Sequence, residues 1–133
     1  MNTPSSIQWI RVLLVSLLIE VVLIVVTIPI YLIVGEQIFV GSVVVLVFVV
    51  PFLITRWAAR KIKSRLILHG FLIGIVATLM YLGLVLAGGG MQAAITMYGP
   101  FIFTFANGLR TLGTVLGAAS EKRRRAATTP AVA

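Results

Sequence analysis

Four long apolar segments, separated by short connections, constrain this chain more than any other feature. They cover residues 9–34, 38–57, 66–87 and 91–117. A helix needs about 20 predominantly apolar residues to cross the hydrocarbon core of a bilayer, and each segment is long enough. Short connections place consecutive helices side by side and antiparallel. The sequence therefore predicts an all-α polytopic membrane protein whose four transmembrane helices form two helical hairpins.

The connections differ in charge, which predicts an orientation. Those at residues 35–37 and 88–90 contain no basic residue, whereas basic residues crowd the central connection and follow the fourth segment. Lys and Arg are enriched in cytoplasmic loops, so we expect both termini and the central connection to face the cytoplasm. The same side chains could meet anionic lipid headgroups. They are Arg56, Arg60, Lys61, Lys63, Arg65, Lys122, Arg123, Arg124 and Arg125.

Composition supports membrane residence independently. Hydrophobic residues make up 60% of the 133 positions and charged residues 11%, too apolar a mixture for a soluble domain of this size. The net charge of +8 lies almost entirely at predicted helix ends, which argues against a nucleic-acid partner. We expect the bilayer to be the main partner, and the cytoplasmic membrane of a bacterium to be the location.

The chain divides into three parts. We expect a short cytoplasmic N-terminus at residues 1–8, a transmembrane domain at 9–119, and a basic, disordered cytoplasmic tail at 120–133. Residues 51–55 and 100–104 both begin with Pro-Phe and end with Thr, at an offset near 50 residues. This match indicates either a parallel internal repeat or a chance similarity between apolar segments, and the sequence leaves both open.

Charged residues within the apolar segments are costly there and predict a buried polar cluster. At 1.5 Å per residue, Glu20 in the first segment and Arg110 in the fourth reach a similar depth, with Asn107 one turn from Arg110. We expect Glu20 to face Arg110. The pair could be structural, Glu20 could couple to protons or ions, or Arg110 could reach the interface and leave Glu20 to a partner protein.

Small residues at four-residue spacing predict close helix contacts. Gly70 and Gly74 form one such pair and Gly113 and Gly117 another, which allows backbones to approach within a membrane. We expect the third and fourth segments to pack on each other through these glycines, although either pair could bind another subunit. The second segment, mostly Val, Leu, Ile and Phe, is the best candidate for a lipid-facing helix.

Residues for catalysis or metal binding are scarce. The chain has one histidine, His69, three acidic residues and no cysteine, so we expect no metal, no cofactor and no enzymatic activity. The leading hypothesis is a non-catalytic accessory subunit or assembly factor that contacts another membrane protein, or itself, through its helices. The alternative is a small homo-oligomeric transporter or channel that uses the cluster of Glu20, Asn107 and Arg110.

Overall fold

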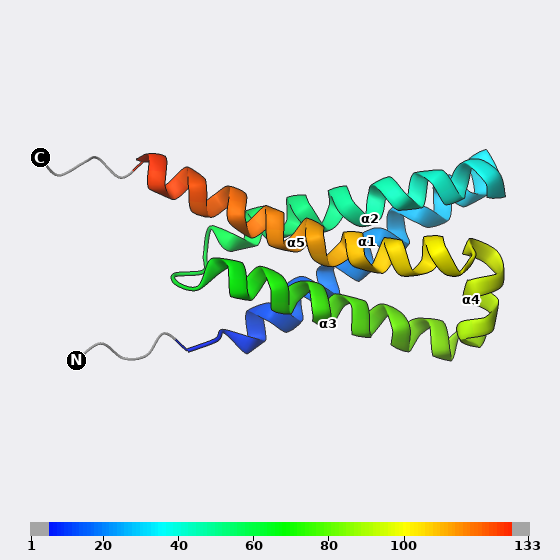
Figure 1. Ribbon diagram of the computed structural model, residues 1–133, viewed down its shortest axis with the longest axis horizontal. Helices are drawn as coiled ribbons and strands as arrows, with labels where there is room; N and C mark the ends of the chain where they lie inside the picture. Colours follow the sequence, from blue (N-terminus) through cyan, green and yellow to red (C-terminus); the bar gives the residue numbers. More distant parts are fainter. Residues whose placement is uncertain (1–5, 129–133) are drawn as a thin grey trace, which may run out of the picture.

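Long apolar helices dominate the computed structural model, which describes residues 6–128, with the side chains of residues 36 and 37 excepted (Figure 1). Over that range the protein is all-helical, as predicted. The helices are α1 (Trp9–Val34), α2 (Glu36–Ala59), α3 (Leu66–Ala87), α4 (Gly90–Tyr98) and α5 (Pro100–Thr128). In α1, α2 and α3 the apolar stretches Trp9–Val34, Ile38–Ala59 and Leu66–Ala87 are long enough to cross a membrane.

The four long helices form a bundle in which α1 and α5 lie at opposite corners. Helix α5 packs against α2 and α3, and α1 packs against the same two helices. The beginning of α1, the α2–α3 connection and the end of α5 gather at one end of the bundle, while the short α4 crosses the other end (Figure 1). A contact between α1 and α5 must therefore cross the centre.

The fourth apolar segment is not the continuous helix that we predicted over residues 91–117. The chain breaks at Gly99, whose φ of 76° is disfavoured for residues with a side chain, and α5 starts at Pro100. Proline suits the first position of a helix and disfavours a helical conformation in the residue before it. The Gly-Pro pair therefore separates α4 from α5.

The region expected to be a disordered tail is also different, because α5 continues to Thr128. Glu121 bonds to arginines three and four residues further along the helix, a spacing that stabilises the last turns. Residues 129–133 lie outside the described part of the chain.

The two Pro-Phe motifs behind the suggested internal repeat lie at different places in the fold. Pro51 lies inside α2, where it is buried, whereas Pro100 is the first residue of α5. The two motifs therefore occupy different positions in their helices.

Glycines bring α5 close to two helices at once. A Cβ added to Gly70 or Gly74 of α3 would lie under 3.0 Å from atoms of α5, with the Thr114 carbonyl oxygen and the Thr111 Cα among them. The third and fourth segments thus do pack on each other, although only the glycines of the third supply the close approach.

The glycines of the fourth segment contact α2 instead. A Cβ on Gly113 would lie 2.5 Å from the carbonyl oxygen of Phe48, and one on Gly117 would collide with that of Phe52. Helix α2 is therefore central to the packing, contrary to its expected role as a lipid-facing helix. The sequence of α2 gives no sign of this role, because the small residues that permit the contact belong to α5.

We predict that Gly113→Ala destabilises the bundle by about 1–3 kcal/mol, since the backbone of α2 must shift to admit a methyl group. Gly108→Ala is the matched control, because a Cβ there meets nothing within 4 Å. The control should be neutral, or more stable by up to about 1 kcal/mol. Thermal unfolding in detergent measures both variants, and equal stabilities would contradict this packing.

Candidate functional site: a buried ion pair beside a cavity

Glu20 of α1 and Arg110 of α5 meet in the middle of the bundle. The Arg110 Nε lies 3.3 Å from the Glu20 Oε1, and each residue is only 3% exposed. The structure thus brings together the two charges that the sequence predicted to pair. Because α1 and α5 lie at opposite corners, this contact spans the bundle.

Two further groups fix the guanidinium of Arg110. Its Nη1 donates a hydrogen bond of 3.0 Å to the Asn107 Oδ1, and the Asn107 Nδ2 donates to the Phe103 carbonyl at 2.9 Å. The ring of Tyr81, from α3, lies 4.3 Å from the guanidinium carbon, a cation–π contact. Neither contact involves Nε, the atom that faces Glu20.

The ion pair itself is incomplete. Glu20 Oε1 and Arg110 Nε are buried, yet among the described residues neither atom makes a hydrogen bond. The 3.3 Å contact therefore supplies Coulomb attraction without the bond geometry that normally accompanies a buried pair. Buried charges are expensive unless they are both paired and hydrogen-bonded, so this arrangement is poorly suited to a purely structural role.

A cavity of about 90 Å³ adjoins the pair. All five helices contribute to its wall, which is aliphatic and aromatic apart from a few polar groups. The polar groups are Glu20, Thr27, Tyr81, Tyr98, Asn107 and Arg110, and the apolar ones are Leu23, Ile24, Phe39, Val43, Val47, Ile102, Phe103 and Ala106. Apolar lining with a few convergent polar groups is typical of small-molecule sites.

An open groove lies beside the cavity, at the end of the bundle where α4 lies. It is bounded by α1, α3, α4 and the glycine turn at residues 88–90, and it reaches Glu20. Glu20, Ile24, Tyr81 and Tyr98 border both the groove and the cavity. Of the charge pair, Glu20 borders this groove, whereas Arg110 lines only the cavity.

Sequence reasoning missed two tyrosines of this site. Tyr81 shares a helical face with Gly70, Gly74 and Ala77, a spacing that signalled its inward direction. Tyr98 is the last residue of α4 and reaches the cavity because the chain breaks after it and α4 crosses the end of the bundle. Its ring centroid lies 6.4 Å from that of Phe39, whereas that of Tyr81 lies 6.1 Å from that of Phe103.

His69 lies away from the cavity and bonds to the residue that precedes α1. Its buried ring accepts a hydrogen bond from the Gln8 backbone N–H at Nε2, 3.1 Å away, and Nδ1 lies 3.1 Å from the Arg65 carbonyl oxygen. Since Nε2 accepts, the proton belongs on Nδ1, which donates to Arg65. Within residues 6–128, no group of three or more histidine and acidic side chains could hold a metal ion.

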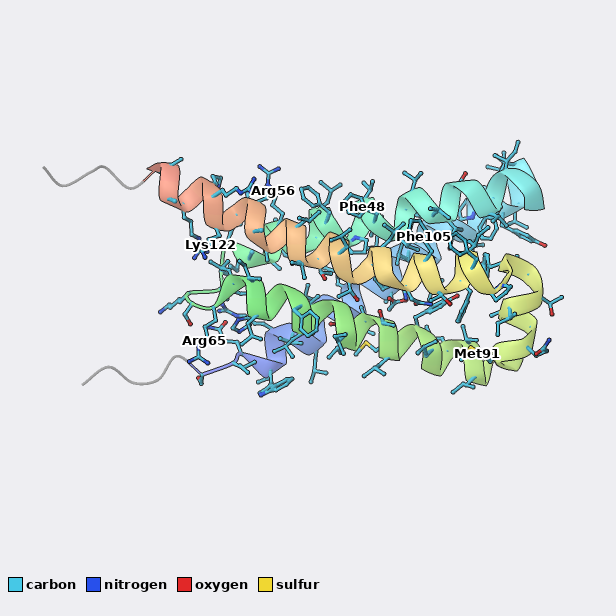
Figure 2. The ribbon with its side chains drawn as sticks, viewed as in Figure 1. Phe48, Arg56, Arg65, Met91, Phe105 and Lys122 are labelled. Atoms are coloured by element: carbon cyan, nitrogen blue, oxygen red, sulfur yellow. The ribbon has the colours of Figure 1, made fainter. Side chains whose placement is uncertain are left out.

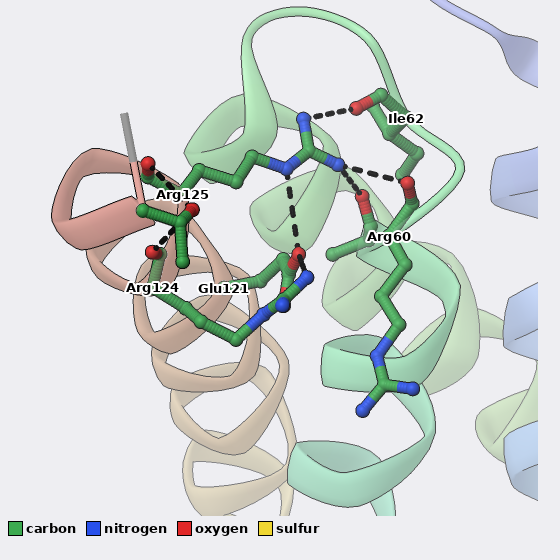
Figure 3. A network of polar contacts seen from close by, with 7 residues as sticks. Arg60, Ile62, Glu121, Arg124 and Arg125 are labelled. Carbon is green, nitrogen blue, oxygen red and sulfur yellow. Dashed lines mark hydrogen bonds and ion pairs between the residues drawn. The ribbon is translucent and has the colours of Figure 1, made fainter. Parts of the chain in front are cut away.

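The basic residues gather at the end opposite α4, where Figure 2 labels Arg56, Arg65 and Lys122. Two of those assigned to lipid headgroups form side-chain hydrogen bonds with other residues of the protein. Arg125 donates to the carbonyls of Ala59, Arg60 and Ile62 at 2.6–3.0 Å, where α2 ends (Figure 3). Arg124 forms a bidentate pair with buried Glu121. The remaining exposed residues of the set assigned to lipid headgroups are Arg60, Lys61, Lys63, Arg65, Lys122 and Arg123.

Comparison with models of protein families, with curated proteins and with solved structures found no match to this chain.

We predict that Glu20→Gln and Arg110→Gln each destabilise the bundle by about 3–5 kcal/mol. The first leaves the charge of Arg110 without a partner, and the second leaves Glu20 either charged and alone or forced to take up a proton. The double variant should be more stable than the sum of the two losses implies, since it removes both charges. Unfolding in detergent measures this cycle. Strictly additive losses would show that the two charges do not interact.

A second prediction concerns Glu121, at the end of α5. Its hydrogen bonds to Arg124 and the neighbouring positive charges lower the pKa of Glu121 from 4.5 to about 2. A carboxylate with a lowered pKa in the folded state contributes stability above its unfolded pKa and loses it as the pH falls to the folded one. Melting temperature should therefore fall more steeply between about pH 5 and 2 in wild type than in Glu121→Gln. Parallel curves would contradict this role.

Proposed function

We propose that this protein is a small transporter or channel of the cytoplasmic membrane, with its substrate site at Glu20, Asn107 and Arg110. In this proposal α1, α2, α3 and the apolar part of α5 cross the bilayer, and the basic end faces the cytoplasm. The observation that supports it best is the buried charge pair beside a cavity, with an open groove bordering Glu20 on the side of α4.

The energetics of charge in a membrane favour this role. Ionisable residues within membrane segments are rare, and they commonly mark substrate or ion pathways. Here Glu20 and Arg110 keep atoms without hydrogen bonds beside the cavity, so a bound molecule could complete the site. A pair with a purely architectural role would gain more from a closed set of hydrogen bonds.

An accessory subunit remains the second candidate, and one surface favours it. Phe101 and Phe105 stack with centroids 5.9 Å apart on the exposed side of α5, and the space around Gly108 is open. A neighbouring helix could approach this side closely. The glycine pairs that first suggested a partner, by contrast, are occupied by contacts within the chain.

Gentle extraction of the tagged protein from its own membrane distinguishes the two roles. We expect a monomer or a homo-oligomer, without larger proteins in stoichiometric amount. Recovery with a stoichiometric membrane protein, abolished by Gly108→Leu but retained in the Glu20→Gln/Arg110→Gln double variant, would establish the accessory role instead.

A further inference from the structure

The charge of the binding site limits what it can hold. Glu20 and Arg110 together carry no net charge, and they lie in a low-dielectric interior where any uncompensated charge is costly. An ion that enters alone would give the site a net charge. It must therefore bring a counter-charge or cause one member of the pair to become neutral.

Only one member of the pair can become neutral. Arginine stays protonated in proteins, whereas a carboxylate that loses its partner in an apolar site takes up a proton. A cation bound to Glu20 would leave the charge of Arg110 uncompensated. An anion bound to Arg110 leaves Glu20, which a proton can neutralise. The pair therefore discriminates in favour of anions.

We propose that the cavity binds a small monocarboxylate on Arg110 and that Glu20 takes up one proton as it binds, an inference that rests on the proposed transport function. The carboxylate oxygens accept hydrogen bonds from Nε and Nη2 of Arg110. The Glu20 oxygen leaves Nε and becomes an O–H, with the proton drawn from the solution on the side from which the carboxylate enters. One anion and one proton enter together, so the site stays neutral.

The orientation of Arg110 suits this ligand. Asn107 holds Nη1 and the ring of Tyr81 covers one face of the guanidinium. Nε faces the Glu20 Oε1 at 3.3 Å and makes no hydrogen bond among the described residues. The Nε and Nη2 groups of an arginine form one edge of a planar fork, which matches the two oxygens of a carboxylate. Arg110 and Glu20 both line the cavity, and in this proposal the carboxylate reaches Nε when the Glu20 oxygen leaves it.

The cavity also limits the size of the ligand. An engineered cavity of about 150 Å³ holds the six carbons of benzene, so 90 Å³ corresponds to about four non-hydrogen atoms, the size of acetate. The wall around the polar floor is apolar, which suits a methyl or ethyl group. Larger carboxylates would have to extend into the groove beside α4.

The surroundings contain few other groups that could take the proton. Arg110 of α5 faces Glu20, Tyr81 of α3 and Tyr98 of α4 line the same cavity, and the part of α2 that lines it is apolar. Tyrosine is neutral near pH 7, with an ordinary pKa of about 10. Glu20 is therefore the group whose protonation should follow binding.

Calorimetry of wild-type protein in detergent, titrated with sodium acetate in buffers of different ionisation enthalpy, tests the inference. We expect acetate to bind with uptake of one proton. The dissociation constant should then rise about tenfold per pH unit over the range in which Glu20 is ionised in the free protein. Tetramethylammonium chloride, as the cation probe, should not bind.

Two variants separate acetate from neutral acetic acid. In Glu20→Gln the site is permanently without the acidic charge, so acetate should bind with no proton uptake and should raise the melting temperature more than in wild type. Arg110→Gln should lose acetate binding. Arg11→Gln, which changes a basic residue that bonds to the Lys61 carbonyl at the other end, is the control and should bind like wild type.

Three outcomes would overturn the inference. Binding of tetramethylammonium in place of acetate would refute the anion but retain a ligand site, so the proposed transport function would survive. Proton uptake that persists in Glu20→Gln would identify acetic acid as the ligand and remove Glu20 as the proton acceptor. Failure of both probes to bind wild type would refute the ligand class, whereas the extraction experiment tests the function separately.

Discussion

An uncompensated charge in the interior of a protein is expensive, and the arrangement of this bundle depends on how Glu20 and Arg110 avoid it. The two residues lie on helices at opposite corners, so their contact of 3.3 Å draws α1 and α5 toward a common centre. Around that centre, close approach is possible because α3 and α5 present glycines where backbones meet. The Glu20–Arg110 attraction and the close backbone contacts at the glycines therefore both hold the helices together.

The same pair also creates the site. Asn107 and Tyr81 hold Arg110 from two directions but do not complete its hydrogen bonds, and Glu20 has none among the described residues. The break at Gly99 adds a second element, because it turns α4 across the bundle and places Tyr98 over the cavity. A continuous fourth helix would leave that end without this cover. The fold thus encloses a polar floor within apolar walls.

Much of this fold followed from the sequence, because the length of each apolar segment is a local property of the chain. The bounds of α1 and α3 matched the predicted segments, and the depth of Glu20 and Arg110 followed from helical rise alone. The role of α2 did not, since its close contacts come from Gly113 and Gly117 on another helix. The Gly-Pro pair before α5 is present in the sequence. The length of the apolar segment around it nevertheless led to the prediction of one continuous helix. The cavity is formed where five helices meet, so no pattern within a single segment of the sequence predicts it.

Infrared spectroscopy of the carboxyl groups tests the central claim most directly, because the chain contains only three acidic residues. If Glu20 is ionised and paired with Arg110, wild type at neutral pH should lack the C=O stretch of a protonated carboxyl. Arg110→Gln should introduce that band, and the double variant with Glu20→Gln should remove it again. A protonated-carboxyl band in wild type that disappears in Glu20→Gln would show that Glu20 is neutral and unpaired, and would contradict the account.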